Sequence, residues 1–232
     1  GMKEMFHGAD SFDQDIGAWD VSKVTDISRM FLGANSFDQP IGEWDVSKVT
    51  DMHQMFASAR SFDQPIGEWD VSNVTTMRRM FSAAESVNQA IGEGDVSNVA
   101  DMNYMFFRAE SFNQDIGEWD VSNVTDMRFM FGVASSFDQG IGEWDVSNVT
   151  NMALMFYQAE SFDQDISTKT INAGTPEEYT AWDVSGVTDM RSMLSATSFN
   201  QDIGEWDVSS VTDMGGMFSA TSFDQDIGEC DV

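Results

Sequence analysis

The amino-acid sequence repeats itself about every 25 residues, and this periodicity constrains the fold more than any local pattern does. The clearest unit is SFNQDIGEWDVSNVTDMRFMFGVAS, from Ser111 to Ser135. About nine copies are visible in the 232 residues. One column of isoleucines has no exception: Ile16, Ile41, Ile66, Ile91, Ile116, Ile141, Ile166, Ile203 and Ile227. Repetition within one chain indicates a structural unit that recurs and stacks on its neighbours.

The first part of each unit has the pattern of a short strand. In residues 116–124 the apolar positions alternate around Trp119, while Glu118 and Asp120 point the other way. This alternation predicts a strand with one buried side.

The second part of each unit has the spacing of a helix. Its apolar residues follow at i, i+3, i+4 and i+7, with Thr125 or Asp126 placed to cap the start. In the clearest unit these apolar residues are Met127, Met130, Phe131 and Ala134. The spacing predicts one short helical turn in each repeat.

One strand and one helical turn cannot bury their apolar sides alone, so the repeats must stack. We therefore predict a single domain over residues 1–232: a right-handed α/β repeat solenoid of about nine coils, with a parallel sheet on one side and short helical turns on the other. Residues 167–181 form an insertion, in which the string Thr-Pro-Glu-Glu favours a helical turn with Pro176 near its first position. A solenoid tolerates such a loop as simple decoration.

The chain stops at Val232 in mid-strand, with Cys230 at the tryptophan position. This pattern indicates a truncated, uncapped end, and such an end favours end-to-end self-association.

The charge balance excludes several classes of function. The 11 Lys and Arg residues stand against 40 Asp and Glu residues, a net charge of −29, which disfavours binding to nucleic acid and to anionic membranes.

No apolar run is long enough to cross a bilayer, so no membrane insertion is expected. A single cysteine excludes an internal disulfide. His7 and His53 are the only histidines, which argues against a histidine base, a zinc site or an enzyme, and no cofactor is expected.

The strand pattern I-x-x-W-x-V-x-x-V looks like a degenerate leucine-rich repeat, and the string WDVSNVTDM resembles the BspA-like leucine-rich repeats of bacterial surface proteins and lipoproteins. The resemblance covers nearly the whole chain apart from residues 167–181. It implies a leucine-rich-repeat-like fold in a cell-surface or secreted scaffold linked to adhesion. It supplies a class of protein and no particular ligand.

Most of the repeated columns are interpreted as structural. The 17 methionines fall in the two columns of the helical stripe, which predicts core packing, and the tryptophans are likewise expected inside. The columns of Gln and of Asn or Asp before it interchange amide and carboxylate, which predicts hydrogen bonding to backbone at a corner of the coil.

Two acidic columns leave two interpretations open. Each Asp that follows a Trp either caps the backbone N–H groups of the next turn, with the Glu column hydrated, or both columns hold Ca²⁺. No calcium-binding loop motif is present, which disfavours a high-affinity site. The residues of the calcium alternative are Asp45, Asp70, Asp120, Asp145, Glu43, Glu68, Glu118 and Glu143.

Positions that vary between repeats are the candidates for specificity. Aromatic residues gather at these positions in the central repeats, close to arginines, and they either contact a partner or extend the core. The candidate partner-binding residues are Tyr104, Phe107, Phe129, Tyr157, Arg78 and Arg128. We therefore expect a non-enzymatic binding or adhesion scaffold, cell-surface or secreted, that recognises a protein or glycan partner. The alternative is an acidic structural element that condenses Ca²⁺.

Overall fold

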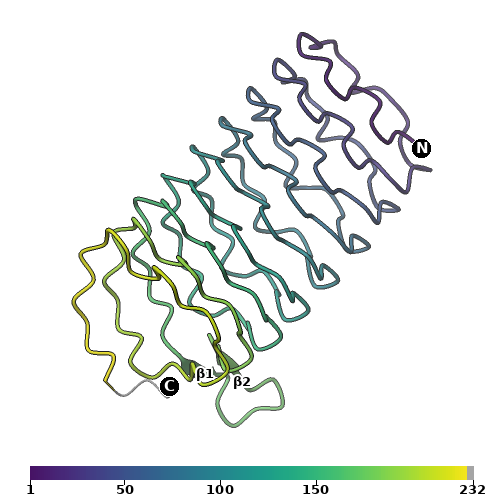
Figure 1. Cartoon of the computed structure of the whole chain (residues 1–232). Helices are drawn as coiled ribbons and strands as arrows, with labels where there is room; N and C mark the ends of the chain where they lie inside the picture. The colour runs from purple at the N-terminus through teal and green to yellow at the C-terminus, as the bar shows by residue number, and fades with distance from the viewer. Residues whose placement is uncertain (229–232) are drawn as a thin grey trace.

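The computed structural model describes residues 1–228 and shows a row of similar coils, each resting on the one before it (Figure 1). The N-terminus lies at one end of the row and the C-terminal coils lie at the other. Residues one repeat apart are neighbours: the N–H of Phe31 donates to the carbonyl of Met55 at 2.9 Å. The prediction that the repeats stack is confirmed.

The prediction of an α/β solenoid with a parallel sheet and helical turns is wrong. Residues 1–228 contain no helix and only two strands, β1 (Lys169–Ile171) and β2 (Tyr179–Ala181). These pair antiparallel, with Thr170 opposite Thr180, in a hairpin of the insertion (Figure 1). Elsewhere in this described part, parallel pairing is limited to isolated bridges, which link Asp26, Asp51, Thr76, Asp101, Asp126, Asn151, Asp189 and Asp213 in sequence.

The segment expected to be helical is a run of tight turns. The N–H of Met30 donates to the carbonyl of Ile27, and that of Ala34 to Phe31, three residues back rather than the four of an α-helix. These turns begin at every second residue, at Ile27, Arg29 and Phe31. They bury positions 27, 30, 31 and 34, which is the spacing that a helix also buries. The inward-facing residues were therefore predicted correctly, while the backbone that presents them was not.

The turns require left-handed backbone at two positions in each coil. Arg29 has φ 55° and Gly33 has φ 73°, and the pattern returns at 25-residue spacing. Most of these positions hold residues other than glycine, which cost about 1–2 kcal/mol each in this conformation. Hydrogen bonds between coils offset that cost: Arg29 donates its N–H to His53 and Gly33 donates to Ala57.

The segment expected to be a strand is also made of turns. The N–H of Trp44 donates to the carbonyl of Ile41, and that of Val49 donates to Val46. A glycine follows every isoleucine of the column except Ile166, and it lets neighbouring coils approach: a Cβ on Gly42 would lie 2.4 Å from the carbonyl oxygen of Pro65. No side chain fits at such a distance, which explains why Ile-Gly recurs.

The core is a set of stacked columns. Phe31 and Phe56 stack with centroids 5.6 Å apart, and each packs at 3.9 Å on the Phe six residues later. Each buried tryptophan donates its indole N–H to the isoleucine carbonyl of the preceding coil, as Trp44 does to Ile16 at 3.2 Å. The predicted core position of the tryptophans is confirmed. Of the methionines, Met5 and Met214 are exposed instead, because each lies in an end coil with a neighbour on one side only.

The insertion forms the β1–β2 hairpin. Pro176 lies in a hydrogen-bonded turn, in which the N–H of Glu178 donates to the carbonyl of Thr175 at 3.2 Å, but no helix forms there. Tyr179 fastens it to the coils by donating its hydroxyl to the carbonyl of Glu143 at 2.6 Å. The expectations at Cys230 and Val232 lie outside the described residues.

Candidate functional site

Four aromatic side chains from three successive coils meet on one face of the molecule. Tyr104 stacks on Phe129 at 4.7 Å, and Phe107 meets both rings edge-on at 5.5 and 5.3 Å. Tyr157 extends the group, 6.4 Å from Phe129. All four side chains are half-buried and none belongs to the hydrophobic core. They form a second aromatic layer outside the stacked columns of the core.

The repeat geometry brings these rings together. Tyr104 and Phe129 are 25 residues apart and both have left-handed backbone, with φ 58° and 55°. Gly132 leaves room beneath them, because a Cβ there would lie 2.7 Å from the Phe129 ring and 3.2 Å from the Phe107 ring. The predicted aromatic group is therefore brought into one cluster by its place in the stack.

Arginines surround the rings. The guanidinium carbon of Arg79 lies 4.5 Å from the centre of Tyr104, that of Arg128 lies 5.8 Å from the same ring, and that of Arg108 lies 5.5 Å from Phe107. These are cation–π distances. We call Tyr104, Phe107, Phe129, Tyr157, Arg79, Arg108 and Arg128 the aromatic–arginine cluster.

The arginines at the cluster retain unused hydrogen-bonding capacity. The Nε atoms of Arg79 and Arg128 are buried and have no hydrogen-bond partner within residues 1–228. Arg128 also lies 3.6 Å from Asp126 through Nη2, and the predicted residue Arg78 is exposed. Arg79 and Arg108 were missing from the predicted site. The 25-residue spacing from Arg79 to Tyr104 is the sequence signal that finds the first of them.

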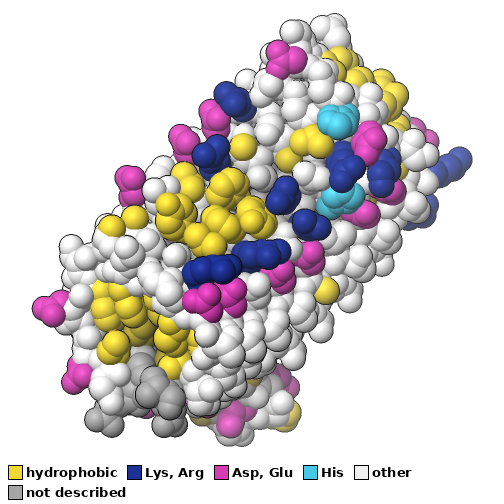
Figure 2. Space-filling view, viewed as in Figure 1, with side chains coloured by type: hydrophobic (Ala, Val, Ile, Leu, Met, Phe, Trp, Pro, Cys, Tyr) yellow, Lys and Arg dark blue, Asp and Glu magenta, His cyan; other side chains and the backbone are white. Residues whose placement is uncertain are grey.

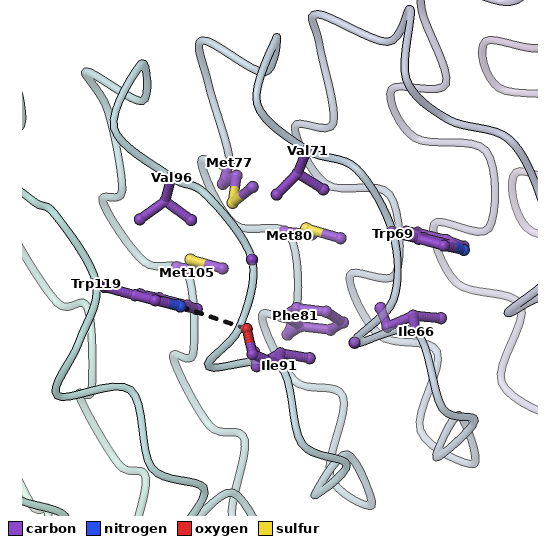
Figure 3. Close-up of a pocket in the computed structure, with 12 residues that line it drawn as sticks. Ile66, Trp69, Val71, Met77, Met80, Phe81, Ile91, Val96, Met105 and Trp119 are labelled. Atoms are coloured by element: carbon purple, nitrogen blue, oxygen red, sulfur yellow. Dashed lines mark hydrogen bonds between the residues drawn. The ribbon is translucent and has the colours of Figure 1, made fainter.

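A gap interrupts the tryptophan column at Gly94. Its apolar lining includes Ile66, Trp69, Phe81 and Trp119, and its volume is about 30 Å³ (Figure 3). Phe81 has no tryptophan ring beside it, whereas Phe106 has Trp119 at 6.3 Å. The gap is the second candidate site.

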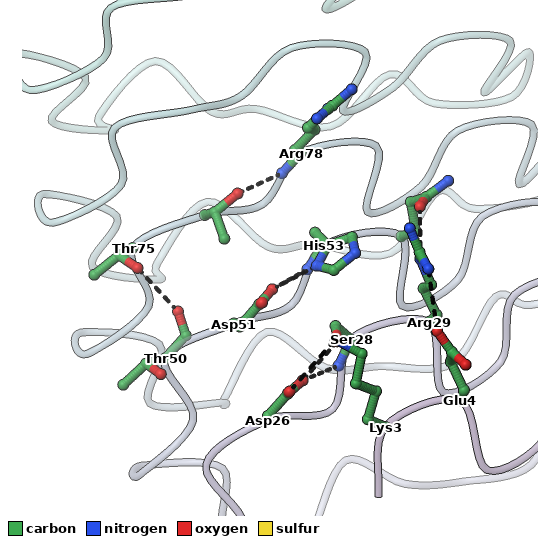
Figure 4. Close-up of polar contacts among 12 residues, drawn as sticks. Lys3, Glu4, Asp26, Ser28, Arg29, Thr50, Asp51, His53, Thr75 and Arg78 are labelled. Carbon is green, nitrogen blue, oxygen red and sulfur yellow. Dashed lines mark hydrogen bonds and ion pairs between the residues drawn. The ribbon is translucent and has the colours of Figure 1, made fainter.

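The acidic column beside the tryptophans closes local turns. Asp45 accepts both the N–H of Ser47 at 3.1 Å and its hydroxyl at 2.6 Å. Hydrogen bonds from the serine lower the pKa of Asp45, and the same cause lowers that of Asp95. The matching bonds at Asp70, Asp120 and Asp145 confirm the predicted capping. A second column makes the same kind of turn, as Asp51 does with His53 (Figure 4).

The calcium alternative finds no such support. Glu43, Glu68, Glu118 and Glu143 are exposed, and the aspartates of the pattern already accept hydrogen bonds within their own turns. Among the described residues no three His, Cys, Asp or Glu side chains come together in an arrangement that could hold a metal ion.

The corner column forms the predicted ladder. The carboxylate of Asp38 accepts the N–H of Asp63 and the side-chain amide of Gln64, both at 2.9 Å. Two repeats further along the chain, the side-chain oxygen of Asn88 accepts the N–H of Asn113 and the side-chain amide of Gln114. Amide and carboxylate interchange here because only an acceptor oxygen is needed.

A chain made of stacked 25-residue coils with one continuous core is a repeat protein. It belongs to the family described as "Mycoplasma protein of unknown function, DUF285", whose sequence model matches residues 1–109, 83–179 and 169–232. Searches of the curated proteins and of the solved structures found no match. Within the described part of the chain, no helix has the length and apolarity to span a bilayer.

Proposed function

We propose that this chain is a non-enzymatic binding scaffold, exposed on a cell surface or secreted, that holds a protein or glycan partner on the aromatic–arginine cluster. The observation that carries the proposal is the half-buried aromatic layer outside the core. The stack does not need rings there, because Gln54 and Ser192 occupy the Tyr104 column in other coils with the same backbone. Rigid rings and arginines are the residues that contribute most to binding interfaces.

The charge distribution supports the same face. The chain carries 11 basic residues, and three arginines gather at these rings with Arg78 adjacent in sequence to Arg79. Figure 2 shows Lys and Arg side chains beside the hydrophobic area. On an otherwise acidic molecule, this face is suited to a partner that combines acidic or hydroxyl groups with a flat apolar surface. The resemblance to BspA-like repeats favours a position outside the cell.

The proposal is tested by comparing the parent with a variant in which Tyr104, Phe107, Phe129 and Tyr157 are all Ser. Both are screened against a glycan array and a panel of extracellular proteins. The variant should lose at least tenfold in affinity for whatever the parent binds, about 1.4 kcal/mol.

A matched control changes the Phe107 column three repeats away from Phe107. Leu32→Ser should leave binding unchanged while altering a comparable position of another coil. Equal binding by the parent and the four-Ser variant would show that the partner binds outside this cluster.

A further inference from the structure

The gap at Gly94 has a shape that the other coils define. In the described coils around it, the same position holds an indole ring, and the ring's N–H donates to an isoleucine carbonyl 28 residues earlier. Trp69 donates to Ile41 at 3.2 Å, and Trp119 donates to Ile91 at 3.3 Å. The equivalent acceptor for position 94 is the carbonyl of Ile66, which lines the gap.

We propose that this gap, the Gly94 slot, binds a small ligand of the indole class: a flat, neutral aromatic ring that carries an N–H group. The slot presents the two features that hold an indole in the neighbouring coils. These are an apolar wall containing Phe81 and the backbone carbonyl of Ile66, whose equivalents at Ile41 and Ile91 accept an indole N–H. Figure 3 shows the slot between Trp69 and Trp119, with the indole of Trp119 bonded to Ile91.

The slot is accessible from outside. Gly94 and Ile91 are half-buried, whereas Trp69, Trp119 and Phe81 are at most 5% exposed. The opening therefore lies on the Gly94 side, and a ring enters edge-first with its N–H leading toward Ile66.

The slot suits a ring better than water. Its volume of about 30 Å³ exceeds the roughly 10–15 Å³ that one water needs, but its lining is almost wholly apolar and a water needs two to four polar partners. An indole is larger than the gap, so the walls must move apart. Met77, Met80 and Met105 line the slot, and their unbranched side chains adjust more readily than those of branched residues.

Charge at the opening selects among indoles. Glu93 and Asp95 flank Gly94 in the sequence and are exposed. These carboxylates disfavour an anionic ligand such as an indole carboxylate, so neutral indole should bind more tightly.

The test titrates the intact parent with indole and with indole-3-acetate, following the methyl signals of the methionines by NMR. Indole should shift the signals of Met77, Met80 and Met105 and leave Met155, which lies outside the slot lining, unchanged. Indole should also raise the melting midpoint with ligand concentration, and indole-3-acetate should bind at least tenfold more weakly.

Two variants sharpen the test. Gly94→Trp fills the slot and should abolish the indole response. Trp144→Gly opens an equivalent gap beneath the carbonyl of Ile116 and should acquire the response there as a positive control. No shift of the three methionine signals in the parent, or an undiminished response in Gly94→Trp, overturns the proposal. The parent NMR result decides the matter even if a variant fails to fold, and it is independent of the aromatic–arginine cluster.

Discussion

Two neighbouring coils, residues 86–110 and residues 111–135, follow nearly the same backbone with different cores. The second carries Phe112 and Trp119, while the first has Val87 and Gly94 at those positions. The two aromatic residues of the second coil pack on Phe106 just before it, Phe112 at 3.9 Å and Trp119 at 6.3 Å. Phe81, one repeat earlier, precedes Val87 and Gly94 instead and stacks only on Phe56 and Phe106. The comparison shows that hydrogen bonds between coils keep the backbone path even where the core is depleted.

The largest loss of stability should come from removing an aromatic core residue of the second coil as well. Trp119→Ala removes a ring that is 5% exposed and its hydrogen bond to Ile91, beside a coil that already lacks two aromatic groups. We expect a loss of about 3–5 kcal/mol in the free energy of unfolding, measured by denaturant titration. An unchanged midpoint would show that the ring contributes little to the stack.

The depleted coil should open more readily than its neighbour. The N–H of Gly94 donates to Ile91 over 3.4 Å, while the equivalent bond from Trp119 to Ile116 is 3.2 Å long. We expect amides of residues 87–94 to exchange at least tenfold faster than those of residues 112–119, about 1.4 kcal/mol in opening free energy. Uniform exchange across both coils would contradict the assignment of a weak coil.

Refilling the depleted coil should stabilise it. Gly94→Trp places an indole beside Phe81 and should raise the free energy of unfolding by about 0.5–2 kcal/mol in a thermal or denaturant melt. A Cβ at this site meets the side chain of Val71 at 3.3 Å, so a small adjustment is needed. The control is Gly92→Ala in the same coil, which should destabilise because its Cβ would lie 2.3 Å from the carbonyl oxygen of Asp115.

The smallest expected effect lies on the polar side of the same two coils. Burial raises the pKa of Asp101, and the charge of Asp126 in the next coil raises it further, against lowering by the Asn103 N–H, Arg78 and Arg128. The folded state therefore binds the proton more tightly, and the stability from Asp101 is lost as the pH rises above its ordinary pKa of 3.8.

Asp101→Asn should consequently raise stability at pH 7 by about 0.2–1 kcal/mol, the size of a single side-chain pair effect between adjacent strands. Asn151 shows that an amide makes the same turn, since it accepts the N–H of Ala153 at 3.0 Å. Thermal melts of the parent and the variant from pH 3 to pH 7 should show that the variant's gain in stability disappears toward pH 3. Asp95→Asn is the control and should bring no gain at pH 7, because serine hydrogen bonds lower the pKa of Asp95.

The sequence predicted the candidate cluster in part. Tyr104, Phe107, Phe129 and Tyr157 stood out because they break the pattern of their columns, and the structure brings all four together. Arg79 precedes Tyr104 by one repeat, so its place beside that ring follows from the spacing, whereas the contact of Arg108 with Phe107 depends on where a long side chain turns and spacing does not specify it. The shape of the Gly94 slot depends on the rings of two adjacent coils, which the sequence of a single repeat does not show.

The sequence by itself determined the 25-residue period, the stacking, the residues that face inward and the ladder at the coil corner. Each follows from which positions are apolar and which carry an acceptor oxygen. Only the tertiary structure decided how the backbone travels between those positions. A run of turns and a helix bury the same spacing, and the choice between them depends on whether an N–H such as that of Phe31 bonds within its coil or to Met55 in the next. That partner is distant in sequence, so local pattern carries no information about it.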